Sequence, residues 1–170
     1  FERAGVPAAA RMADGRLIVA HQHFPEHDDA AFDKVAVRFS SDEGLTWTAA
    51  EVIRVEGLPE GMRFPFDPTL VALPDGRVRL YFTSVKGRRL DQAPPAIYSA
   101  VSKDGVAYAF EPGIRFGIDG RIVIDCAVVL HEGVFLPCGK PRAADFIELI
   151  FKELLALGGL LPQLRQAAEH

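Results

Sequence analysis

The sequence predicts a mainly β protein, a partial β-propeller of four-stranded antiparallel units, followed by a C-terminal α-helical tail. Three observations predict this fold class. Hairpin turns containing a glycine recur at Gly15, Gly76 and Gly133, at intervals of 61 and 57 residues. Acidic turns recur at Asp42 and Asp104, 62 residues apart. Beyond residue 140 the turn residues disappear and the apolar spacing becomes helical. Short strands that repeat at this period indicate four-stranded sheets stacked radially around an axis.

The composition is that of an ordinary soluble globular protein. The chain has 170 residues, of which 49% are hydrophobic and 25% are charged, with a net charge of −4 and a pI of about 5.7. No basic block indicates nucleic acid or an anionic membrane as a partner. The apolar runs of the tail are interrupted by Lys152, Glu153 and Gly158-Gly159, so no membrane-spanning helix is predicted. No cofactor is predicted.

Each unit begins with a hairpin. A glycine in a short loop between two β-rich runs supplies the positive φ that a tight turn needs. The runs are rich in Val, Ile, Phe and Tyr, as half-buried strands prefer. The predicted strand pairs are Val6–Met12 with Arg16–His21, Thr69–Leu73 with Arg77–Phe82, and Ile122–Leu130 with Val134–Leu136.

A further strand follows each of the first two hairpins and ends in an acidic turn. One begins near Lys34 and ends at Ser40, and the other begins near Ala96 and ends at Ser102. With a strand after the turn, each unit has four strands. The sequence therefore predicts a partial propeller over residues 1–140, with blades at about 4–56 and 64–117 and a half-blade at 121–140, and an amphipathic helical tail over 141–170.

The tail carries an apolar stripe at helical spacing. Successive members are three or four residues apart: Phe146, Ile150, Leu154, Leu157, Leu161 and Leu164. Such a stripe needs a partner surface. It either caps the open edge of the half-blade, which would otherwise invite aggregation, or packs against the same stripe of a second copy, and both can hold together.

Two segments resemble known families. The stretch 40–47 matches in full the Asp-box, a motif of sialidases and of other propellers with bacterial-neuraminidase repeats, through Ser40, Asp42, Gly44, Thr46 and Trp47. A shortened copy without the tryptophan follows at Ser102, Asp104 and Gly105. The resemblance implies that these residues are structural and lie at the outer edge of a propeller, away from its active-site face.

The segment 66–81 resembles the innermost hairpin of five-bladed glycosidase propellers. It opens with Phe66-Asp67-Pro68, and in those proteins an Asp-Pro commonly opens the first strand of a blade beside the central channel. The two resemblances together cover residues 1–140, or about two and a half blades. The tail from Arg142 onward resembles neither family.

Two carboxylates are the candidate catalytic residues. Aligned on the turn glycines, Asp67 and Asp125 open equivalent strands, and Val6 takes that place in the first unit. The resemblance implies that they lie near the mouth of the channel. Because adjacent carboxylates repel, the pKa of one should rise, which is how glycosidases keep an acid and a base at one pH. Arg63 is a candidate substrate-binding residue for an anionic sugar. The alternative is that all three are structural, since an Asp before Pro often shapes a turn.

Two other groups of residues are candidate sites. His21 and His23 lie at i and i+2 on a strand with His27 nearby, and such a pair could hold a metal. A solvated polar loop is the favoured interpretation, because no second ligand group has metal-like spacing, and no metal site is predicted. Cys126 and Cys138 are expected to be buried thiols, with a cross-strand disulfide as the alternative.

Two and a half blades cannot close a ring, so a homodimer joined through the open blade edge and the tail helix is predicted. The favoured function is a non-catalytic carbohydrate-binding or assembly module derived from a glycosidase. The alternative is a glycoside hydrolase that uses Asp67 and Asp125 in a channel completed by a second copy, and a truncated reading frame without a settled function is a third. The arginine cluster, the Tyr–Glu pair and the acid of sialidases are not found as a set, and Tyr81 and Tyr98 are expected in the core or on a sheet face.

Overall fold

The computed structural model describes residues 3–24, 34–63, 65–86, 95–131 and 134–141, with 129–131 and 134–141 described by their backbone only. Every regular element in these ranges is a β-strand, which confirms the mainly β prediction. The chain divides into two compact units, Phe1–Lys140 and Pro141–His170. The predicted tail helix lies outside the described residues. Among those residues, no helix has the length and apolarity needed to cross a membrane.

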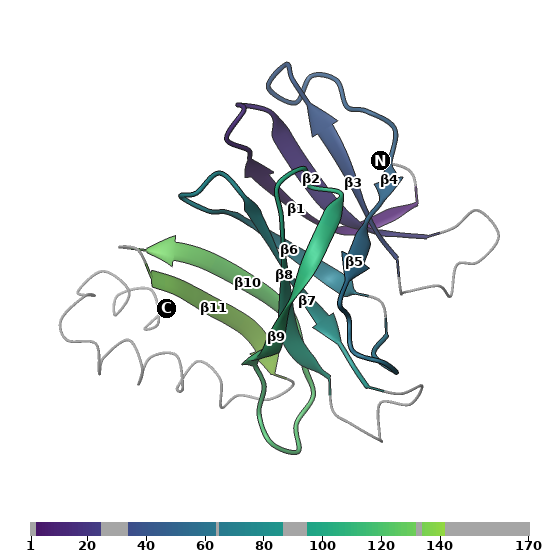
Figure 1. Cartoon of the computed structure of the whole chain (residues 1–170), viewed down its shortest axis with the longest axis vertical. Coiled ribbons are helices and arrows are strands. Elements are labelled where there is room, and N and C mark those ends of the chain that lie inside the picture. The colour runs from purple at the N-terminus through teal and green to yellow at the C-terminus, as the bar shows by residue number, and fades with distance from the viewer. Residues whose placement is uncertain (1–2, 25–33, 64, 87–94, 132–133, 142–170) are drawn as a thin grey trace, which may run out of the picture. The chain divides into compact units, whose positions relative to one another are not determined.

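The first sheet has four antiparallel strands (Figure 1). They follow one another in space as in sequence: β1 (Ala4–Arg11), β2 (Leu17–His23), β3 (Val35–Ser40) and β4 (Glu51–Val52). The strands alternate between the two faces, and on one face Ile18, Ala20 and Val37 are fully buried. The predicted hairpin and the strand ending at Ser40 are both present.

The second sheet has five strands in the order β5-β9-β8-β7-β6. These are β5 (Arg54–Glu56), β6 (Phe66–Ala72), β7 (Val78–Ser84), β8 (Ala96–Ser102) and β9 (Ala107–Phe116). The prediction of four antiparallel strands was wrong here, because β5 lies parallel to β9 and belongs to this sheet and not to the first.

The chain crosses between the two sheets at a single buried residue. Ile53 is 1% exposed, and its N–H donates to the Val35 carbonyl of the first sheet. The next N–H, of Arg54, donates to the Val106 carbonyl beside the second sheet. Burial of Ile53 between the sheets therefore directs β4 and β5 to different neighbours, and the first predicted unit ends near residue 52 instead of 56.

The third sheet consists of β10 (Val123–His131) and β11 (Val134–Pro141), which pair with each other. They correspond to the two strands predicted for the third unit. The turn glycine at position 133 lies outside the described residues.

The hairpin turns of the first two sheets are alike bond for bond. Gly15 has φ of 88°, and Gly76 has φ of 84°. In each turn the glycine N–H donates to the carbonyl three residues earlier, at 3.0 and 3.1 Å. In each, the Asp before the glycine accepts the backbone N–H and the guanidinium of the Arg after it. The predicted equivalence of these two positions is confirmed.

The sheets pack face to face, with the second sheet in the middle. One of its faces joins the first sheet in a core that includes Leu70, Leu80, Phe82, Ile18 and Val37. The other face joins the third sheet in a smaller core that includes Val71, Tyr81, Ile97, Val123 and Cys126. Strand β6 contacts both β1 and β10, so these three strands, one from each sheet, lie side by side (Figure 1). This is how blades of a propeller meet at its axis.

Candidate functional site at the first strands of the three sheets

Strands β1, β6 and β10, one from each sheet, each contain one residue with a left-handed backbone. Val6, Asp67 and Asp125 have φ of 45°, 52° and 54°. The β1–β2 pairing slips between Gly5 and Ala8, and the β6–β7 pairing slips at the matching place, between Phe66 and Thr69. A bulge of this kind breaks the ladder and turns the side chain away from the strand's normal alternation. The sequence alignment of these three positions is thus confirmed by the backbone.

This conformation is costly for the residues that hold it. A left-handed backbone is uncommon outside glycine, although Asp tolerates it better than a β-branched residue does. Such strain, of about 1–3 kcal/mol per residue, persists only where the surroundings enforce it and often marks functional positions. Three occurrences at one place in three consecutive sheets make it a property of the fold.

Asp67 is held by a residue of the neighbouring sheet. The Asp67 N–H donates to Gln22 Oε1 at 3.1 Å, and Gln22 is 3% exposed at the end of β2. Thr83 of β7 pairs with Phe66 as Gln22 pairs with Gly5, so Gln22 and Thr83 occupy matching places in their sheets. Thr83 Oγ1 is buried and has no hydrogen-bond partner among the described residues. It lies near enough to the Asp67 carboxyl to affect its pKa, although the two groups do not have the geometry of a hydrogen bond.

The Asp67 carboxyl is partly buried, and its acidity reflects this. Burial, and next the negative charge of Asp125, raise its pKa from the ordinary 3.8 to about 6, while the Thr83 hydroxyl limits the rise. The structure therefore brings Asp67 and Asp125 close enough to interact electrostatically, as the sequence predicted. At neutral pH a fraction of Asp67 therefore stays protonated.

The residue after Asp125 is also linked to the second sheet. The hydroxyl of Thr69 in β6 donates to the backbone carbonyl of Cys126 in β10. The Cys126 side chain is 5% exposed, as predicted, and that of Cys138 lies outside the described residues. Sequence reasoning missed Gln22, Thr69 and Thr83, because their roles depend on contacts between sheets that leave no local pattern.

The other candidate residues lie close to the same strands. The backbone of Arg63 is fixed just before β6, since its N–H donates to the Val85 carbonyl and its carbonyl accepts from Ser84 Oγ at 2.9 Å. Tyr81 lies in the smaller core, and Tyr98 stacks on Phe82 with ring centroids 6.3 Å apart, as expected of core residues.

His21 and His23 lie edge to face with ring centroids 6.0 Å apart. His21 is 1% exposed, and burial lowers its pKa, which favours the neutral ring. The described residues contain no cluster of three His, Cys, Asp or Glu side chains that could hold a metal ion, and His27 lies outside them.

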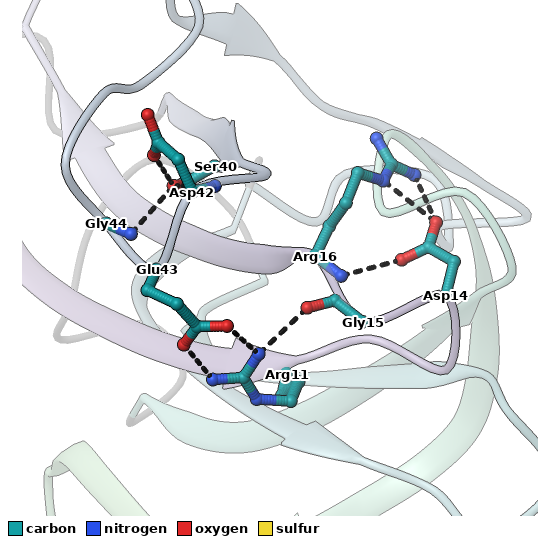
Figure 2. Close-up of polar contacts among 8 residues, drawn as sticks. All are labelled: Arg11, Asp14, Gly15, Arg16, Ser40, Asp42, Glu43 and Gly44. Atoms are coloured by element: carbon teal, nitrogen blue, oxygen red, sulfur yellow. Dashed lines mark hydrogen bonds and ion pairs between the residues drawn. The ribbon is translucent and has the colours of Figure 1, made fainter.

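The acidic turn after β3 is a compact hydrogen-bonded corner (Figure 2). Ser40 Oγ donates to Asp42 Oδ1 at 2.7 Å and accepts the Gly44 N–H at 2.8 Å. Asp42 also accepts the backbone N–H of Thr46, and the Trp47 indole donates to the Gly44 carbonyl. Hydrogen bonds from the side chain and backbone of Thr46, and then from Ser40, lower the pKa of Asp42 to about 2. The carboxylate is therefore committed to the turn.

A second contact ties this corner to the first hairpin. Arg11 donates to both carboxylate oxygens of Glu43 and to the Gly15 carbonyl, and Arg16 pairs with Asp14 (Figure 2). Glu43 has φ of 59°. The corner and the hairpin turn thus form one polar surface, separate from the left-handed positions at the other end of β1.

The turn after β8 repeats the same design. Ser102 Oγ donates to Asp104 Oδ1 and accepts the Gly105 N–H, each at 2.9 Å, and Asp104 Oδ1 also accepts the N–H groups of Val106 and Ala107. Gly105 lies against the first sheet, where an added Cβ would be 2.5 Å from Ile18 Cδ1. Both turns use their carboxylate to cap backbone groups, which makes them structural.

An ion pair crosses the face of the second sheet that carries Tyr81. Glu111 in β9 accepts from Arg79 Nε and Nη2, each at 2.8 Å, and from Ser99 Oγ at 2.8 Å. Burial alone would raise the pKa of Glu111, but the bonds from Arg79 and Ser99 outweigh it and lower the pKa. This pair fixes β7 to β9 across β8.

Several solved structures to which this chain is similar are carbohydrate-active proteins. The β-fructofuranosidase of Bombyx mori aligns over 84% of this chain with a TM-score of 0.63 and 17% identity. An α-L-arabinanase of Penicillium chrysogenum aligns over 82% of this chain with a TM-score of 0.57 and 19% identity. An N-acetylgalactosamine deacetylase from F. plautii aligns over 77% of this chain with a TM-score of 0.57 and 18% identity. The alignments span 30%, 42% and 37% of those chains, so this chain covers well under half of each.

At these identities the likeness shows the fold alone, and the three proteins differ in activity. No protein-family model and no curated protein matches the sequence. Together with the sheet packing, the alignments show that the described sheets have the fold of a glycosidase-like β-propeller.

Proposed function

We propose that this chain is a carbohydrate-binding propeller segment whose ligand site is built around Asp67 and Asp125. The observation that carries the proposal is the pair itself: two carboxylates on strained, equivalent positions of adjacent sheets, close enough for one to raise the pKa of the other. Carboxylates that accept hydrogen bonds are well suited to the hydroxyl groups of a sugar. A fold that keeps two repelling carboxylates at these positions gains no stability from the repulsion, which favours a binding role.

Binding is tested by calorimetric titration with a panel of oligosaccharides. The solved structures with this fold include an arabinanase bound to arabinobiose and an enzyme bound to xylotriose, so arabino-, xylo- and fructo-oligosaccharides are the first probes. Asp67→Asn and Asp125→Asn should each weaken binding by about tenfold or more, since each removes a charged acceptor. Asp119→Asn, on an exposed turn, is the matched control. Equal binding by all three variants would disprove the assignment.

Hydrolysis is the second candidate, favoured by the raised pKa of Asp67. Protonated Asp67 would give its proton to the glycosidic oxygen as the C–O bond breaks, and ionised Asp125 would take a proton from the water that attacks the anomeric carbon. The products are a hemiacetal and an alcohol, and the cycle closes when Asp67 takes a proton from solvent and Asp125 releases to solvent the proton that it took from the water. Turnover of aryl glycosides should then fall above about pH 6, where Asp67 loses its proton. Sugar binding without turnover across such a panel leaves the non-catalytic module.

The ring would be completed by a second copy of the chain. The three sheets described here do not close, and a two-fold homodimer through the open edge and the tail is the simplest closure. Light scattering at micromolar concentration should give twice the mass of 18.6 kDa. A monomer at all concentrations would rule out a shared channel but not the carboxylate pair, which lies within one chain.

The remaining residues have supporting roles in this proposal. The turns at 40–47 and 102–105 act as Asp-boxes that stabilise the outer corners, and the hydrogen bonds of Asp42 and Asp104 support that role. Arg63 would contact an acidic sugar. It should matter only for uronate-containing ligands, so Arg63→Gln is expected to weaken their binding and leave neutral oligosaccharides unaffected.

A further inference from the structure

Each link between neighbouring sheets at the left-handed positions runs from a side chain of one sheet to the backbone of the next. Gln22, in the first sheet, accepts the N–H of Asp67 in the second at 3.1 Å. Thr69, in the second sheet, donates to the carbonyl of Cys126 in the third. The first link is to the N–H of Asp67 itself, and the second is to the carbonyl of the residue that directly follows Asp125.

These links contact the backbone where its conformation is strained. Asp67 and Asp125 have φ of 52° and 54°, and a left-handed residue in a broken ladder has no strand partner to hold its peptide in place. At Asp67 the buried Gln22 side chain accepts the backbone N–H, and at Cys126 the half-buried Thr69 hydroxyl donates to the backbone carbonyl. Gln22 is 3% exposed, so water has little access to the amide oxygen that accepts the Asp67 N–H. Breaking this hydrogen bond would therefore cost the free energy of leaving a buried polar group unpaired.

We propose that Gln22 and Thr69 are positioning residues, each fixing the acid of the following sheet and so setting how the Asp67 and Asp125 carboxylates face each other. The two contacts are features of the fold and do not depend on the proposed function. Only the reason for positioning the two acids, which is to bind a sugar, rests on the proposed function. On this view the geometry of the pair is determined by residues that never touch a ligand.

Nuclear magnetic resonance titration of the full chain tests the role of Gln22. Gln22→Met keeps the length of the side chain and removes the acceptor. The amide proton of Asp67 should then exchange with solvent about tenfold faster or more. The carboxyl pKa of Asp67 should move by about half a unit or more, because its burial and its distance to Asp125 both change. Thr48→Val is the matched control, since it removes a side-chain bond to the Phe39 N–H at the outer corner.

A double-variant comparison tests Thr69. In the parent chain, Asp125→Asn should lower the pKa of Asp67 by removing the charge of Asp125. In a Thr69→Val background, which keeps the side-chain shape, the same change should lower that pKa by a different amount. Equal decreases in the two backgrounds would show that Thr69 does not set the relation between the acids.

The outcomes are separable from those of sugar binding. If Gln22→Met leaves the Asp67 amide protected and its carboxyl pKa unchanged, the positioning role is disproved, whether or not a glycan binds. If Gln22→Met does not fold, Gln22→Asn keeps the amide but shortens the reach, and the same two readouts decide. If the parent chain binds no glycan but Gln22→Met still changes the Asp67 amide exchange and carboxyl pKa, the proposed function is contradicted and the positioning role stands.

Discussion

Replacing Asp67 by Asn should make the folded chain more stable at neutral pH and have no effect in acid. The pKa of Asp67 is about 6 in the folded state, against an ordinary 3.8, so the folded chain binds more protons between these values than the unfolded chain. Stability contributed by this group therefore falls as pH rises from about 4 to 6, and the cost is complete above that. This is opposite in sign to a salt-bridged Asp.

The magnitude follows from the size of the shift. A change from 3.8 to about 6 converts to about 3 kcal/mol, at about 1.4 kcal/mol per pKa unit. Because the carboxyl is only partly buried, solvent screening reduces this to about 1–2 kcal/mol. Asn removes the charge, keeps the size, and is among the residues that best tolerate the left-handed backbone. Asp67→Asn should thus raise the free energy of unfolding by about 1–2 kcal/mol at pH 7.5.

The assay is urea unfolding followed by the fluorescence of Trp47, the single tryptophan, at pH 7.5 and pH 4. The gain should be present at pH 7.5 and absent at pH 4. Asp75→Asn is the control, because a side-chain hydrogen bond from Arg77 lowers the pKa of Asp75, and its replacement should not stabilise at either pH. The reasoning would be refuted if Asp67→Asn were less stable than the parent at pH 7.5. It would also be refuted if the variant changed the free energy of unfolding by the same amount at pH 7.5 and pH 4.

Three further changes test the strain and packing described above. Val6→Asn should stabilise by about 1 kcal/mol because Asn accepts the left-handed backbone, whereas Val6→Thr, still β-branched, should not; urea unfolding compares them. Gly105→Ala should destabilise by about 1–3 kcal/mol, since its Cβ would lie 2.5 Å from a buried isoleucine, while Gly15→Ala, which meets nothing within 4 Å, should cost only backbone strain. Glu111→Gln should cost about 1–2 kcal/mol at pH 7 by removing the charge that pairs with Arg79. The Glu111 pKa is lowered in the folded state, so this difference should shrink as pH falls below the ordinary 4.5 and disappear once the folded-state carboxylate is protonated.

The hairpins and acidic corners were predictable because their chemistry is local. The turn at Gly76 needs a positive φ and an Asp that bonds two residues ahead, and both requirements are written in adjacent letters of the sequence. The repeat spacing then aligned Val6, Asp67 and Asp125 without any structural information. Local turn chemistry combined with a period was enough to locate the carboxylate pair, although not to establish what it does.

The features that the sequence did not reveal depend on contacts between sheets. The crossing of the chain at Ile53 depends on which sheet offers a free edge, and that is decided only when the two sheets pack. The bond from Gln22 to the Asp67 N–H joins residues 45 positions apart. A buried Gln at a strand end looks like any polar residue near a loop. Such long-range bonds to the backbone carry no residue preference that a single sequence displays.

The recurrence of one backbone conformation with different side chains separates fold from function at this site. The bulge occurs at Val6 as well as at Asp67 and Asp125, so it cannot exist for the sake of a carboxylate. It follows that each of the three described sheets supplies a strained position at the same place, and the residue at that position determines the chemistry. At Val6, 48% exposed, the position carries an apolar side chain and no acid. A site made by two of three equivalent positions is then asymmetric by sequence alone, because the first sheet presents an apolar side chain where the second and third each present an acid.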